Sequence, residues 1–126
     1  MKQLSAEACI EYILRDIDKR RTVDYADKNS VRRYNAAMDR IVSRANFICE
    51  NYPDKMELLV TLLDHPDYQI AATCTSVLFG LRSATKEHKL AAIKAARRLL
   101  LRPELSDMEK FIWTTNIDLW ETEIAK

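Results

Sequence analysis

One segment, residues 58–81, restricts the possible folds of this chain more than any other. Two apolar runs flank the four residues Asp64-His65-Pro66-Asp67, and in each run the apolar side chains recur three or four positions apart, as they do on one face of a helix. Pro66 lacks an amide proton and clashes with a preceding helical turn, so no helix continues through it. Asp67 can cap the second helix by accepting a hydrogen bond from its free amides. The segment therefore predicts two helices that meet at a tight corner, each with an apolar stripe to bury.

The rest of the chain also has the composition of a helical protein. Its 126 residues include a single glycine, Gly80, and three prolines. These are too few for the turns of an all-β protein or for the phosphate loops of an α/β protein. We therefore expect an all-α fold of about six helices stacked as antiparallel pairs, in a single domain over residues 1–126. Capping residues mark the expected helix starts: Ser5, a position between Asp24 and Ser30, Asp54 with Glu57 in a capping box, Asp67, Ser83 or Thr85, and Ser106.

The corner resembles the centre of a HEAT-type helical repeat. The matching run is Leu62-Leu63-Asp64-His65-Pro66-Asp67-Tyr68-Gln69-Ile70, followed by Ala72. In HEAT-type repeats an arginine that links successive repeats usually follows the apolar residue near the start of the second helix, which is Ile70 here. In this chain Ala71 stands at that position instead. The layout of about residues 30–120 is also similar to a small bacterial family with a HEAT-like core and no assigned catalytic residues. The resemblance implies an irregular HEAT-like superhelix that binds rather than catalyses.

The chain carries no residue pattern of a known catalytic or metal site. His65 and His88 lie in different segments, and neither stands four residues from another histidine or from a cysteine. The sequence contains no glycine-rich phosphate loop and no Gly-x-Ser-x-Gly elbow. We therefore predict a protein that is not an enzyme and holds no cofactor or metal. An enzyme whose site is assembled around His65 stays a weaker alternative.

The three cysteines, Cys9, Cys49 and Cys74, are far apart and are surrounded by apolar helix residues. An odd number without paired spacing argues against a disulfide framework and indicates buried thiols. No apolar run approaches the ~18–20 residues that span a bilayer. The stretch Met1–Ser5 leads directly into a charged amphipathic helix instead of an export signal. We therefore expect a cytoplasmic protein without membrane attachment.

Two of the expected helices carry more cationic or apolar side chains than a buried core requires. The helix expected over residues 86–102 is basic and has a mixed apolar and cationic face, which suits a protein partner. The same long side chains can instead cover neighbouring apolar surface or attract the acidic helix that follows. The last helix has one apolar stripe of Trp113, Ile117, Trp120 and Ile124, and beside it a second stripe of Met108, Ile112, Thr115 and Leu119. We expect this helix to be wrapped into a groove between earlier helices.

These observations predict a non-catalytic helical module that binds another protein. By analogy of size and architecture, it is a bacterial immunity or antitoxin-type protein that blocks a toxin domain. The main alternative is nucleic-acid binding through the cations of the basic helix, which the net charge of only +1 disfavours. The sequence does not indicate the oligomeric state. The expected partner-binding residues are Leu90, Lys94, Arg97, Arg98, Leu101, Arg102, Trp113 and Trp120.

Overall fold

The computed structural model describes residues 3–126 and contains no strand among them, so the all-α prediction is confirmed. Met1 and Lys2, the start of the Met1–Ser5 stretch, lie outside the described residues. The six α-helices are α1 (Ala6–Lys19), α2 (Lys28–Asn51), α3 (Glu57–Val60), α4 (Tyr68–Gly80), α5 (Lys86–Leu100) and α6 (Asp107–Ala125). Three short 3-10 turns connect them: η1 (Arg20–Thr22), η2 (Pro53–Lys55) and η3 (Thr61–Asp64).

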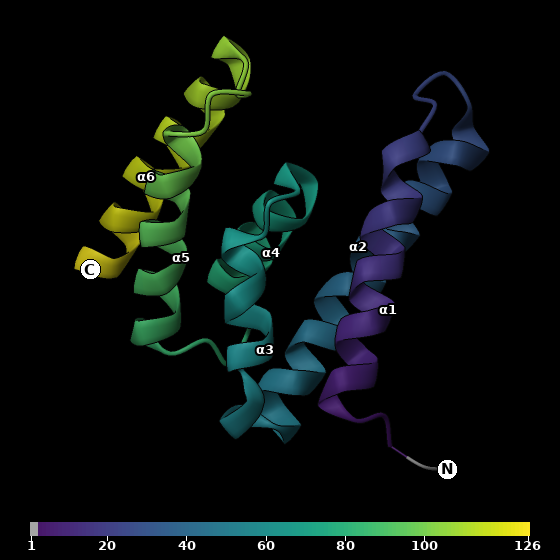
Figure 1. The fold of residues 1–126 in the computed structure, drawn as a ribbon, viewed down its shortest axis with the longest axis horizontal. Helices are drawn as coiled ribbons and strands as arrows, with labels where there is room; N and C mark the ends of the chain where they lie inside the picture. The colour runs from purple at the N-terminus through teal and green to yellow at the C-terminus, as the bar shows by residue number, and fades with distance from the viewer. Residues whose placement is uncertain (1–2) are drawn as a thin grey trace.

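The helices form three neighbouring pairs (Figure 1). The long helices α1 and α2 pack together at one end of the molecule, α3 and α4 form the middle pair, and α5 and α6 lie at the other end. The middle pair contacts both outer pairs, most extensively through α4 and α5. None of the described helices is long and apolar enough to cross a membrane.

The expected caps explain most of the helix starts. At the start of five helices a side-chain oxygen of the N-cap residue accepts a hydrogen bond from a backbone N–H of the first turn. These N-cap residues are Ser5, Asp27, Asp67, Thr85 and Ser106. The third helix is the exception, because Asp54 lies within η2 and Met56 stands at the N-cap without a side-chain bond. The capping box predicted for Asp54 and Glu57 is therefore wrong. Pro53 begins a 3-10 turn at that point, and the chain enters α3 directly from it.

One apolar core runs through the three pairs. The large side chains that are almost completely buried come from every pair: Ile13, Ile41, Ile48, Leu59, Leu63, Leu78 and Leu99. Ala71, at the position where the resemblance to HEAT-type repeats implies an arginine, is fully buried. No solvent reaches this position, so a long cationic side chain could not place its charge in water. The packing of the core therefore explains why a small residue stands here.

The three cysteines are free and buried, as the sequence predicts. Cys9 and Cys74 are 0% exposed, and Cys49 is 7% exposed. Burial raises the pKa of the Cys74 thiol to about 12, and it also raises the pKa of Cys9 and of Cys49 above the ordinary value. The thiols therefore remain protonated and act as small apolar residues of the core.

Candidate functional site

Arg98 of the basic helix α5 and Arg102, two residues after the end of that helix, bind the corner that precedes α4. Arg98 donates from Nε and Nη2 to the carboxylate of Asp64, at 2.6 and 2.9 Å. Arg102 donates from Nη1 to the carbonyl oxygen of Pro66 at 3.0 Å and from Nη2 to that of His65. These bonds satisfy carbonyl groups that the corner leaves without helical partners. Both side chains therefore hold the last helix pair against the middle one.

The first helix pair binds the same corner from the other side. Arg21 in η1 donates from Nη2 to Asp67 at 2.7 Å and from Nε to Asp18 at 2.9 Å. The hydrogen bond from the Arg21 guanidinium holds the pKa of Asp67 below its ordinary value. The resemblance assigns contacts between neighbouring pairs to an arginine at the position of Ala71. Here such contacts come from arginines outside α4.

The remaining residues expected to bind a partner through α5 are exposed. Arg97 pairs with Glu121 of α6 at 2.7 Å, so the expected attraction between the basic and the acidic helix is present in this pair. Lys94 is exposed, Leu90 is 40% exposed, and Leu101 is 83% exposed at the end of the helix. The exposed part of the α5 face is therefore mixed, with Leu90, Lys94 and Leu101 open to solvent.

Both tryptophans of α6 face the protein interior. Trp113 is 4% exposed, and its Nε1 donates to the hydroxyl of Tyr68 at 2.8 Å. Trp120 is half-buried and stacks on Phe79, with ring centroids 4.4 Å apart and planes at 9°. Ile117, between them on the same stripe, is also buried. This stripe attaches α6 to the other helices, and two aromatic contacts connect it to α4.

The second apolar stripe of α6 is exposed. The exposed fraction is 68% for Met108 and for Phe111, 46% for Ile112 and 62% for Leu119. These four side chains and the exposed Thr115 together form a surface that we call the α6 face. The expectation that α6 is wrapped into a groove is therefore wrong. The helix lies at one end of the stack and buries only the stripe that carries the tryptophans (Figure 1).

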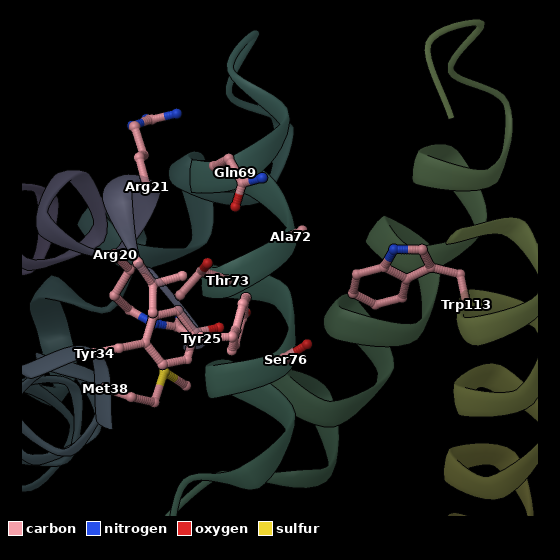
Figure 2. Close-up of a pocket in the computed structure, with 11 residues that line it drawn as sticks. Arg20, Arg21, Tyr25, Tyr34, Met38, Gln69, Ala72, Thr73, Ser76 and Trp113 are labelled. Atoms are coloured by element: carbon pink, nitrogen blue, oxygen red, sulfur yellow. The ribbon is translucent and has the colours of Figure 1, made fainter. Parts of the chain in front are cut away.

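A hollow of about 450 Å³ crosses one side of the stack, and we call it the inner groove. Figure 2 shows Arg20, Tyr25, Tyr34 and Met38 on one side of it, short side chains of α4 in the middle and Trp113 on the other side. The α4 residues are Gln69, Ala72, Thr73 and Ser76, and the lining also includes Arg21 and Val23. The groove therefore brings together all three helix pairs.

Arg20 is the central cation of the inner groove. Its Nη2 donates to the hydroxyl of Tyr34, and its guanidinium carbon lies 4.1 Å from the centroid of that ring. Its Nε is buried without a hydrogen-bond partner among the described residues, and no carboxylate within residues 3–126 forms an ion pair with it. Tyr25, 73% exposed, packs edge-on against Tyr34 at a centroid distance of 6.0 Å. This wall of the groove is aromatic and positively charged.

The inner groove leads onto the α6 face. α5 lies against the side of α6 that carries Glu121 and Ile124. The groove reaches α6 at Trp113. Around the helix from Trp113, in the direction away from α5, come the side chains of Glu109 and Asn116 and then Ile112, the first residue of the α6 face. The groove and the α6 face are therefore neighbours on one side of the stack.

Sequence reasoning missed the inner groove. The signal in the sequence is the combination of Arg20, Arg21 and Tyr25, just after the first helix, with Tyr34 of the second helix. These side chains can stack or carry charge. Helical periodicity places Tyr34 on a stripe but does not indicate that α4 lies opposite it.

The two histidines have structural hydrogen bonds. Nδ1 of His65 accepts from the backbone N–H of Asp67 at 2.9 Å, a bond that closes the turn at the corner. His88 completes the capping box of α5 with Thr85. In the part of the chain that the structure describes, no group of three or more His, Cys, Asp or Glu side chains is placed to hold a metal ion.

Comparisons with protein-family models, with curated proteins and with solved structures returned no match for this chain. Only the surfaces of the molecule itself therefore bear on its function.

Proposed function

We propose that this protein is a non-catalytic, HEAT-like helical module that binds another protein. The α6 face carries the proposal, because four large apolar side chains on one side of a helix are 46–68% exposed. A contiguous apolar patch of this kind is the usual mark of a docking site on a soluble protein. A stack of helices normally ends in a polar face that separates its core from water, and the exposed side of α6 is apolar instead.

The inner groove extends this docking surface. Next to the apolar side chains of α6 it offers the short polar side chains of α4 and the aromatic wall around Arg20. Interfaces between proteins combine an apolar centre with a polar rim, and aromatic and arginine side chains contribute most of the binding energy. A partner that covers the α6 face and reaches into the groove meets both kinds of contact.

A nucleic-acid role for α5 has less support than protein binding. Arg97, Arg98 and Arg102 each have an internal acceptor, so phosphate contacts would compete with bonds that hold the helix pairs together. Lys94 alone among the four predicted cations has neither an ion pair nor a side-chain hydrogen bond within residues 3–126. Phosphate binding needs several cations that are free to replace counterions.

In the narrower form of the proposal, the partner is a toxin domain and this protein is an immunity or antitoxin-type inhibitor in the cytoplasm. This form rests on the small size of the chain and its all-helical architecture, which is an argument by analogy. The three buried free thiols suit a reducing compartment. The location of the protein in cell fractions and the identity of its partner test this form separately.

The experiment combines partner capture with a purified binding measurement. The wild-type protein is used to isolate a partner from its native cells, and calorimetry then measures the affinity of the purified pair. Replacing two side chains of the α6 face by Phe111→Glu and Leu119→Glu should weaken binding by at least about 100-fold, because charges enter an apolar contact. Helical circular dichroism should stay unchanged, since both side chains are exposed.

The matched control is Lys86→Gln with Lys110→Gln. It changes the net charge by the same two units at exposed positions outside the α6 face and should change the affinity by less than about twofold. Full affinity of the Phe111→Glu, Leu119→Glu variant would contradict the proposal.

A further inference from the structure

A second hollow, of about 490 Å³, lies where α1, η1 and the first half of α2 meet. It shares Tyr34 and Val23 with the inner groove. Three cations, Lys19, Arg33 and Arg40, line it, and no aspartate or glutamate does. We propose that this cationic hollow binds the phosphate groups of a small molecule, a phosphate monoester or a diphosphate.

The charges around the cationic hollow are not balanced. Asp16 is 3% exposed, and three cations approach its carboxylate: Arg40 at 2.9 Å, Lys19 at 3.6 Å and Arg44 at 4.0 Å. Arg33 forms no ion pair with any residue in the described range 3–126. The three cations that line the hollow, set against this one carboxylate, leave an excess of two positive charges. Such a cluster in a concave site attracts a multivalent anion.

Two polar groups of the hollow, those of Arg40 and Ser30, are held in place without an anion. Arg40 donates to Asp16 from Nε and from Nη2, which fixes the plane of its guanidinium, and its Nη1 makes no hydrogen bond within the described part of the chain. The hydroxyl oxygen of Ser30 accepts from the backbone N–H of Asp24 at 2.8 Å, so the hydroxyl proton is free to be donated. A ligand therefore meets oriented donors and loses little affinity to their ordering.

The charge excess favours a phosphate over a single carboxylate. A guanidinium matches the geometry of both anions. A phosphate monoester carries about −1.5 to −2 charges at neutral pH and a diphosphate carries more, so either balances the excess better than one carboxylate does. The aromatic ring of Tyr34 and the side chain of Val23 offer an apolar contact for the remainder of a small molecule.

This proposal is independent of the α6 face. The cationic hollow lies on the first helix pair, and the α6 face lies on the last (Figure 1). Loss of anion binding would leave the protein-binding proposal intact, and failure of protein binding would leave the anion site intact. The two are therefore distinguishable with the same set of variants.

Calorimetric titration of the full chain with sodium pyrophosphate and with inorganic phosphate tests the site, and succinate at matched ionic strength serves as the dicarboxylate probe. We expect saturable binding of one pyrophosphate per chain, weaker binding of phosphate, and the weakest binding of succinate. Lys19→Gln with Arg33→Gln should weaken pyrophosphate binding at least about tenfold, because charge-assisted hydrogen bonds are lost. Both side chains are exposed, so the fold should be retained.

The variant Lys94→Gln with Lys110→Gln removes the same charge elsewhere and should change pyrophosphate affinity by less than about twofold. Amide NMR of the wild-type protein gives a second measurement, in which pyrophosphate should shift signals of residues 19–40. Shifts centred elsewhere would overturn the proposal, and so would equal affinity for succinate or unchanged affinity of the Lys19→Gln, Arg33→Gln variant. Single-stranded RNA or duplex DNA that displaces pyrophosphate and binds more tightly than it does would assign the hollow to nucleic acid, and this result would also overturn the proposal.

Discussion

Gly80 ends α4 at a position where the backbone does not need a glycine. Helical spacing permits the fourth helix to continue to Arg82, but α4 stops at Gly80 because Leu81 turns into an extended conformation and enters the core with 4% exposure. Gly80 does not have a positive φ, and a Cβ atom added there would meet nothing within 4 Å. The glycine therefore costs helix stability without a steric reason.

Gly80→Ala should raise the free energy of unfolding by about 0.5–1 kcal/mol, because alanine restricts the unfolded chain and favours the last helical turn. Urea denaturation measures this change. Ala72→Gly, a substitution in the opposite direction within the same helix, should lower the free energy of unfolding. An unchanged or lower stability of Gly80→Ala would show that the end of α4 depends on glycine.

The buried thiols should be unreactive in the folded protein. Because burial raises the pKa of Cys74 to about 12 and also raises the pKa of Cys9 and Cys49, almost no thiolate is present at roughly pH 8. We expect a colorimetric disulfide reagent to titrate no thiol of the native chain rapidly at this pH, and all three thiols in concentrated urea. A thiol that reacts rapidly in the native protein would contradict this expectation.

The raised pKa of Cys74 also links stability to pH. The unfolded thiol ionises near pH 8.5, below the folded one. The contribution of Cys74 is therefore complete below about pH 8.5 and is lost as the pH rises toward about 12. In Cys74→Ala this part of the alkaline loss should be absent when unfolding free energies are compared at several pH values.

Among the elements, the corner before α4 depends on arginines from both neighbouring helix pairs. Arg102→Gln should lower the free energy of unfolding by about 1 kcal/mol, because two carbonyl groups of the corner lose their donor. Arg97→Gln removes only an exposed ion pair with Glu121 and should cost less than about 0.5 kcal/mol. Urea denaturation of the two variants gives the comparison, and equal costs would show that Arg102 is no more than a surface charge.

Most of the helices can be predicted from the sequence, because the signals for helices are local. Side-chain caps and apolar stripes lie within a few residues of the helix ends they determine, as at Ser5, Asp67 and Ser106. Asp54 and Glu57 carry the same local signal, but Pro53 and the packing of Met56 in the core lead to a 3-10 turn instead. A cap pattern therefore predicts a nearby helix more securely than it predicts the first residue.

The exposed surfaces are much harder to predict from the sequence than the helices are. Two apolar stripes on α6 predict two buried sides, and only the positions of α4 and α5 decide that the stripe with Met108 and Leu119 is left exposed. The charge of α5 is visible in the sequence, but the acceptors that bind Arg98 and Arg102 lie more than thirty residues away. The cations without balancing carboxylates are instead distributed over α1 and α2, where acidic neighbours in the sequence conceal them.

For the whole molecule, the α6 face should affect surface properties and not stability. Replacing its four large apolar side chains by glutamine removes exposed groups, so the free energy of unfolding should change by less than about 1 kcal/mol in urea. The variant carries Met108→Gln, Phe111→Gln, Ile112→Gln and Leu119→Gln. Binding of a hydrophobic fluorescent dye should decrease strongly relative to the wild type. A large loss of stability, or unchanged dye binding, would show that these side chains are covered in solution.

Because both tryptophans lie on α6, the tryptophan fluorescence of the molecule comes from one end of the stack only. Trp113 and Trp120 are the only tryptophans of the chain, and both lie at the junction of α6 with α4. Intrinsic fluorescence thus reports on one end of the stack, while circular dichroism averages over every helix. If the terminal pair detaches before the other helices unfold, tryptophan emission and circular dichroism will give different midpoints, because the α1–α2 end has no tryptophan and contributes nothing to that emission.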